Sequence, residues 1–268
     1  MLAFSPGVLG LLVVFEVLYV RAVRILAVRG YRVPRHQQAS WHFGMALQAV
    51  ALLGPLDALA PELLSAHMAQ HILLADIAVP FLLIGIRTPV LVFVPPRRLL
   101  VWLAHRHAAR AVFRFLRQPL VSVPVFLFIL YFWHLGFAFE AALRDPFVHA
   151  AQHASFVFAG VIVWWAALEP QRRRLRGELW KIPYIFASRM VAMFLGVAFV
   201  TARTPLYAGF YGDRPREHGV SPITDQVIAG GIMMTVDILI IVAALIFFFA
   251  RASADYDRAE RAAAATPA

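Results

Sequence analysis

Long apolar segments dominate this sequence and restrict its fold more than any other feature. One helix needs about 20 apolar residues to cross the hydrocarbon core of a membrane. Seven such segments occur in the 268 residues: 7–28, 40–59, 63–86, 119–142, 147–168, 182–202 and 226–250. Hydrophobic residues make up 61% of the chain, against about half of a soluble domain. We therefore predict an all-α, polytopic membrane protein that folds as a bundle of seven transmembrane helices.

These segments also set the expected domain organisation. Together they occupy most of the chain and leave no room for a separate soluble domain. We predict a single transmembrane domain over residues 1–252 and a tail over 253–268, which is rich in Ala and charge and is expected to be disordered. The first segment contains Glu16, Arg21 and Arg24, so we interpret it as a retained helix rather than a cleaved signal peptide.

The net charge of +10 is unevenly distributed along the chain. Arginines concentrate after the first segment, in the 87–118 connection and in the 169–181 connection, whereas the other connections contain few. The positive-inside rule then predicts an outside N-terminus and a cytoplasmic C-terminus. Membrane topology and anionic lipid headgroups explain the net positive charge of the chain. The expected surroundings are therefore a lipid bilayer, and no nucleic-acid partner is needed. The basic stretch within 87–118 is predicted to form a short interfacial helix.

Two histidine pairs stand out within the apolar segments. His67 and His71 lie in SAHMAQHILL, and His149 and His153 lie in VHAAQHASFV. A spacing of i, i+4 places both imidazoles of a pair on one helix face, about 6 Å apart along the axis. The predicted topology brings both pairs, together with His134 of YFWHLGF, to one depth near the outer surface. This convergence predicts a shared metal or haem site.

The residue types limit which metal ion or cofactor that site can bind. The chain has no cysteine, which excludes thiolate ligands. A zincin protease would need Glu after the first histidine of a pair, where Met68 and Ala150 stand instead. Imidazole suits copper, zinc and iron, and thioethers suit copper(I), although methionine in an apolar helix is more often simple packing. We predict a copper ion, with haem as the alternative. Haem is less suited to two histidines one turn apart, because axial ligands approach opposite faces of the porphyrin.

A second layer of polar residues is expected deeper in the bundle. It comprises the acids Glu16, Asp76 and Asp237 together with Arg189. An unpaired charge at that depth is costly, so Arg189 should pair with one or two of these acids. The same layer leaves open a proton-linked transporter, although the sequence shows no internal repeat of the kind that transporters have.

Three stretches of the sequence resemble the signatures of a known family, in the same order. They are GPLDALAPELLSAHMAQHILLADIAVPFLLIG, WHLGFAFEAALRDPFVHAAQHASFVFAGVIVWWAAL and TDQVIAGGIMM. They are similar to the CtaG-type cytochrome c oxidase assembly factors, which are seven-helix membrane proteins, and the resemblance covers most of residues 40–250.

The resemblance implies a multi-pass protein of the bacterial plasma membrane that is not an enzyme. Such a protein would accept copper from a donor protein at the outer face and pass it to cytochrome c oxidase subunits. The metal ligands that the resemblance implies are His67, His71, His134, His149 and His153, and Asp57 and Asp225 would support them from the outer ends of their helices.

The sequence also departs from the family pattern at several positions. Gly136 stands where a proline is frequent, Phe139 where a tyrosine is usual, and Gln152 where an acidic residue precedes the last histidine. Met234 and Val236 replace a common tryptophan and proline. Because Gln152 removes a possible carboxylate ligand, metal affinity or preference is expected to differ from that of other members.

Overall fold

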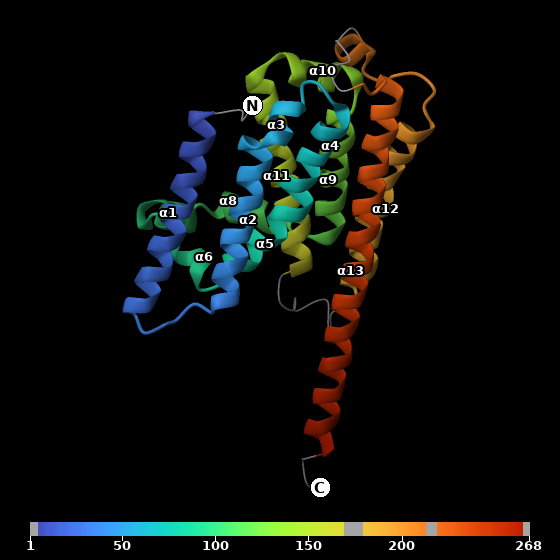
Figure 1. Ribbon diagram of the computed structural model, residues 1–268. Coiled ribbons are helices and arrows are strands. Elements are labelled where there is room, and N and C mark those ends of the chain that lie inside the picture. Colours follow the sequence, from blue (N-terminus) through green and yellow to red (C-terminus); the bar gives the residue numbers. More distant parts are fainter. Residues whose placement is uncertain (1–4, 169–178, 213–218, 265–268) are drawn as a thin grey trace.

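The computed structural model describes residues 5–168, 179–212 and 219–264, and every regular element in these ranges is helical. The helices stand side by side as a bundle, with α3 (Pro55–Leu59) and α10 (Gly136–Arg144) lying at one end (Figure 1). The consecutive α4, η1 and α5, of which η1 is a π-helix, form a single rod. The rod and the longer helices are α1 (Pro6–Val28), α2 (Arg35–Leu53), α4 (Leu64–Ile72), η1 (Leu73–Ala78), α5 (Val79–Gly85), α9 (Pro119–Trp133), α11 (Pro146–Leu168), α12 (Lys181–Thr201) and α13 (Pro222–Ala264). The predicted all-α class is confirmed for the described residues.

Five segments of the described chain are long and apolar enough to cross a membrane. They are Arg35–Leu59, Leu64–Gly85, Pro146–Leu168, Lys181–Thr201 and Pro222–Arg258. A sixth is present if α8 (His107–Leu116) and α9 count as one span, although the two helices meet at an angle of 81°. The five correspond to the second, third, fifth, sixth and seventh of the predicted segments. The total of seven stays a prediction.

The predicted fourth segment, 119–142, is wrong as a continuous helix. Helix α9 ends at Trp133 and α10 begins at Gly136, with Leu135 extended between them. In an unbroken helix the His134 carbonyl would accept a hydrogen bond from the backbone amide four residues later in the chain. It instead accepts one from the Tyr207 hydroxyl, at 2.9 Å. A residue 73 positions away in the sequence therefore helps to end this helix.

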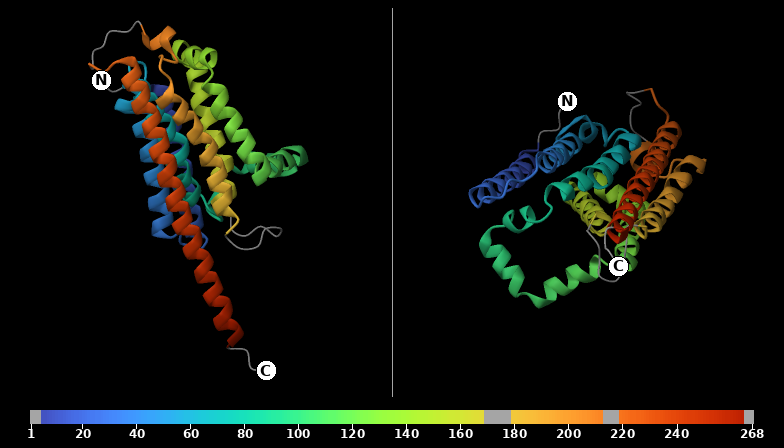
Figure 2. Two further views of the ribbon diagram at one scale, coloured as in Figure 1. Left: turned by 90° about the vertical axis from the view of Figure 1, so that its right-hand side faces the viewer. Right: turned by 90° about the horizontal axis from the view of Figure 1, so that it is seen from below.

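The connection over 87–118 contains three short helices in place of the one that we predicted. They are α6 (Val90–Phe93), α7 (Arg97–His105) and α8. Helix α6 packs against α1, with Val90 buried between them, whereas α7 and α8 form an arm that projects from the side of the bundle (Figure 2). The arm exposes both arginines and large apolar side chains, with Trp102 52% and Phe115 56% accessible. Both kinds of side chain lie on its surface, as an interfacial segment requires.

Helix α13 continues well past the predicted end of the last span. It runs to Ala264 and extends beyond the rest of the bundle (Figure 1). Residues 253–264, which the composition leads us to expect as disordered, are thus helical, while 265–268 lie outside the described residues.

Polar side chains of α2 attach it to the rod of α4, η1 and α5. The Gln37 amide donates to the Gly85 carbonyl at 3.0 Å, and the Gln48 amide donates to the Leu74 carbonyl at 2.9 Å. Both glutamines are buried. Buried polar groups need hydrogen-bond partners within the protein, and these two carbonyls supply one for each side-chain amide.

Glycine allows α11 to approach the rod closely. A Cβ placed on Gly160 of α11 would lie 2.5 Å from the carbonyl oxygen of Ala75 in η1. No real Cβ tolerates that separation, so a larger residue would push the two helices apart. The same rod and the same helix α11 carry the two histidine pairs.

We expect Gly160→Ala to destabilise the bundle. Overpacking costs about 1–3 kcal/mol, which exceeds the roughly 1 kcal/mol that alanine gains over glycine in a helix. The measurement is the temperature at which the detergent-solubilised protein loses its monodisperse peak. Gly231→Ala is the matched control, because a Cβ on Gly231 of α13 meets nothing within 4 Å. Equal stability of the two variants would contradict the close packing of α11 on η1.

Candidate metal centre

Four of the five predicted histidines come together in the structure. His67 and His71 project from α4, and His149 and His153 project from α11. Each residue offers one ring nitrogen that lies within 4.8 Å of the corresponding atom of the other three. The spacing of i, i+4 is what places two imidazoles on the facing side of each helix. We call these four residues the histidine cluster.

The ring geometry shows that the two pairs face each other across the α4–α11 contact. Within each helix the ring centroids are 4.3 Å apart for His67–His71 and 4.2 Å apart for His149–His153. Between the helices they are 5.3 Å apart for His67–His149 and 5.2 Å apart for His71–His153. The four rings thus surround one point rather than forming two separate pairs.

The cluster is buried, and most of its nitrogens lack hydrogen-bond partners. Both ring nitrogens of His67 and His71, and Nε2 of His149 and His153, have none among the described residues. A buried polar atom without a partner costs about 1–3 kcal/mol. Converging imidazole lone pairs are also what copper, zinc or iron would use as ligands. The residues therefore fit a metal ion, and metal binding itself stays a prediction.

Side chains from other helices hold α4 in place. The Asp225 carboxylate, in the first turn of α13, accepts hydrogen bonds from the backbone amides of Leu64 at 2.6 Å and Ser65 at 3.1 Å. These amides have no acceptor within their own helix, because they belong to its first turn. Asp225 therefore caps the helix that carries His67 and His71.

A second anchor of α4 was missed by sequence reasoning. Gln70, which lies between the two histidines, donates to the Ala51 carbonyl at 2.9 Å and to the Asp57 carboxylate at 2.8 Å. Asp57 and Asp225, which we expected to support the site, thus make contacts suited to that role. A glutamine inside an apolar segment was the available signal for Gln70.

His134 is not part of the histidine cluster. It terminates α9, and its Nδ1 lies 2.7 Å from the Leu130 carbonyl oxygen. Its Nε2 lies 3.3 Å from Sδ of Met68. Its Nε2 therefore faces a thioether, although its ring also lies 6.1 Å from the rings of Phe139 and Phe156, which contact His67 and His71.

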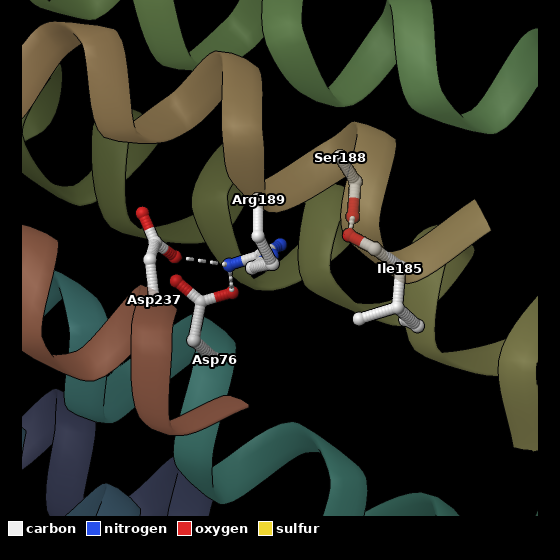
Figure 3. Close-up of polar contacts among 5 residues, drawn as sticks. All are labelled: Asp76, Ile185, Ser188, Arg189 and Asp237. Carbon is white, nitrogen blue, oxygen red and sulfur yellow. Dashed lines mark hydrogen bonds and ion pairs between the residues drawn. The ribbon is translucent and has the colours of Figure 1, made fainter. Parts of the chain in front are cut away.

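The deeper polar layer forms around Arg189. Its Nη1 lies 2.5 Å from Oδ1 of Asp76 and 3.4 Å from Oδ1 of Asp237, so one guanidinium is shared by two carboxylates (Figure 3). The predicted pairing of Arg189 with one or two acids is confirmed.

The inclusion of Glu16 in this layer was wrong. Glu16 pairs with His42 at 2.7 Å and accepts a hydrogen bond from the Trp41 indole at 2.9 Å. The physical reason is position, because α1 lies at the edge of the bundle beside α2 (Figure 1).

The fold and the cluster together define a class: a helical protein with segments long and apolar enough to span a membrane and with a largely buried group of four histidines. Residues 17–255 match the family of cytochrome c oxidase caa3 assembly factors (Caa3_CtaG). The chain belongs to this family, as the resemblance of its sequence motifs predicted.

Three uncharacterized mycobacterial proteins are also similar in sequence to this chain. Uncharacterized proteins of Mycobacterium bovis and Mycobacterium tuberculosis are each 27% identical over 258 residues, which cover 89% of this chain and 38% of the relative. An uncharacterized protein of Mycobacterium leprae is 29% identical over 207 residues, or 70% of this chain and 30% of the relative. The chain thus spans well under half the length of these curated relatives. No solved structure matches it.

We expect Arg189→Ala to lower the amount of folded protein in the membrane sharply. Removing one partner of a buried ion pair costs about 3–5 kcal/mol, because the remaining charges are left uncompensated. The triple change Arg189→Met, Asp76→Asn and Asp237→Asn should recover part of the loss, since it removes the charges together. Fluorescence-detected size exclusion of a tagged protein measures both. Normal abundance of Arg189→Ala with loss of a pH-dependent function would instead favour a proton-linked transporter.

Proposed function

We propose that this chain assists the assembly of a haem–copper cytochrome c oxidase by binding copper at the histidine cluster and handing it on. Membership of the caa3 assembly factor family supports the assembly role. The observation that carries the copper assignment is the convergence of four imidazoles within 4.8 Å, most of whose nitrogens have no other partner. The role is non-enzymatic, because the chemistry required is exchange of ligands on a metal ion.

Copper is a better occupant than haem for this arrangement. Copper(II) binds imidazole most tightly among the divalent first-row metals, and copper(I) also accepts histidine. Haem would need a flat space between two axial ligands. The rings of Phe139 and Phe156 instead pack against the cluster, with centroids 5.0 Å from His67 and 4.5 Å from His71. Haem remains the alternative occupant that a spectrum would reveal.

One residue of the cluster reaches the surface. His149 is partly exposed, although its Nε2 is buried, whereas the other three members are buried as whole residues. A site that must release its ion benefits from a ligand that solvent or an incoming donor can reach, since closed sites retain their metal. We propose that a copper donor protein delivers the ion through His149 and that an oxidase subunit receives it.

The charge pattern supports an outward position for the cluster. Helix α9 runs from the arginine-bearing arm of α7 and α8 to His134, so the arm and the cluster end lie at opposite ends of this helix. Basic segments remain on the cytoplasmic side. We therefore propose a seven-span topology in the bacterial plasma membrane, with the cluster near the outer face, the N-terminus outside and the C-terminus in the cytoplasm.

We expect His67→Ala and His149→Ala each to lower bound copper and to lower oxidase activity in cells. The double variant should be scarcely worse than either single one, because the residues act as one unit. Elemental analysis and a visible spectrum of the purified protein measure occupancy. The controls are His105→Ala and His107→Ala, two exposed histidines of the arm. Small additive losses without any change in bound metal would mean that the cluster serves packing, and a Soret band would support haem.

The topology makes a separate prediction. Reporter fusions placed after Arg110 and after Arg144 should lie on opposite sides of the membrane, because one span separates these positions. A phosphatase active only outside and a fluorescent protein active only in the cytoplasm provide paired readouts. Fusions that report the same side would overturn the seven-span topology and leave the cluster unaffected.

A further inference from the structure

His134 and Met68 present two metal-binding atoms to each other. The Nδ1 of His134 lies 2.7 Å from the Leu130 carbonyl oxygen, which can only accept, so Nδ1 carries the proton. In the neutral ring, Nε2 then carries a lone pair. That lone pair faces Sδ of Met68 at 3.3 Å, and a thioether has no proton to donate. Two acceptors therefore point at one another without a hydrogen between them.

The spacing of these two atoms suits a shared ion. With bonds of the length that tetrahedral zinc makes, about 2.0 Å to imidazole and about 2.3 Å to sulfur, two ligands of one ion lie about 3.5 Å apart. The observed separation of Nε2 and Sδ is 3.3 Å. The imidazole is also held in position from two sides, through its own Nδ1 and through the Tyr207 hydroxyl on the His134 carbonyl.

A cavity adjoins this pair of atoms. Its lining includes Met68, His71, His134, Met233, Arg189 and Asp237. The space open to the centres of water molecules is about 40 Å³, whereas one water needs about 10–15 Å³ by the same measure. The cavity thus has room for an ion and a water beside the two side chains, and Met233 lines it with a second thioether.

The charges around the cavity match a cation of low charge. The cavity is lined by one positive and two acidic side chains, Arg189, Asp76 and Asp237. Together they carry one formal negative charge when both carboxylates are ionised. The ligand types are imidazole and thioether, which are soft, and thioethers favour copper(I).

We propose that Met68 and His134 form a second metal site, specific for copper(I) and distinct from the histidine cluster, with Met233 as a third ligand from α13. It deepens the proposed function, because it divides copper handling between two adjoining sites. His71 belongs to the cluster and also lines the cavity, so an ion need move past only one side chain to pass from one site to the other. The cluster accepts any imidazole-binding metal, and the thioether site selects copper(I).

The test is metal stoichiometry on the full-length, detergent-solubilised protein. Under anaerobic conditions, copper(I) is titrated in competition with a chromogenic copper(I) chelator, and zinc(II) is titrated in parallel. We expect two equivalents of copper(I) but one of zinc(II), with a sulfur neighbour of copper in the X-ray absorption spectrum. Met68→Leu, which conserves volume, should weaken one copper(I) equivalent at least about tenfold and reduce the sulfur signal, which the remaining thioether of Met233 can still supply in part. Zinc binding should be unchanged.

The controls separate this inference from the function proposed above. Met45→Leu changes a methionine of α2 that packs in a different part of the core, and it should leave both copper(I) equivalents intact. In the His67→Ala/His149→Ala variant, the sulfur-bound equivalent should persist although the other is lost. One copper(I) equivalent in total, or two that do not respond to Met68→Leu, would overturn the second site even if the cluster binds copper. A sulfur-bound ion as the sole copper(I) equivalent of the unsubstituted protein, with no zinc(II) bound, would instead overturn metal binding at the cluster.

Discussion

The interior of this bundle obliges each buried polar group to find a partner, and the structure depends on how that demand is met. Unpartnered polar groups are costly where water is absent. Buried amides therefore join neighbouring helices, as Gln48 does to the Leu74 carbonyl and Gln70 to the Ala51 carbonyl. Arg189 satisfies the same demand with two carboxylates. Several buried polar atoms of the described residues nevertheless lack a hydrogen-bond partner, and those of the histidine cluster converge on one point, where a metal ion would satisfy them together.

The features that sequence could predict are those that depend on local spacing. Apolar segments gave the helices, and the i, i+4 pairs gave two histidine faces that the structure brings together. The pairing of Arg189 also followed, because a charge in an apolar segment needs an acid in any arrangement. These inferences required no knowledge of which helices are neighbours.

The features that sequence could not predict depend on contacts between distant residues. Helix α9 ends at Trp133 because Tyr207, far along the chain, takes the His134 carbonyl. His134 follows that break, and its Nε2 faces Met68, outside the group of four histidines that we expected it to join. Glu16 lies outside the Arg189 layer for a similar reason. Its position within the first apolar segment predicts its depth in the membrane, but the sequence does not show that α1 lies at the edge of the bundle.

The charges around the histidine cluster show how neutral ligands could hold a cation there. Gln152 leaves the group of four imidazoles without a carboxylate, so a bound ion would keep its full charge in an apolar interior, which is costly. Acids nevertheless lie on two sides. Asp57 is close enough to His149 to interact with it electrostatically, and the layer of Asp76, Arg189 and Asp237 borders the cavity that His71 lines. Charge at a distance would attract an ion without forming a bond to it, which is consistent with the hand-over that we propose.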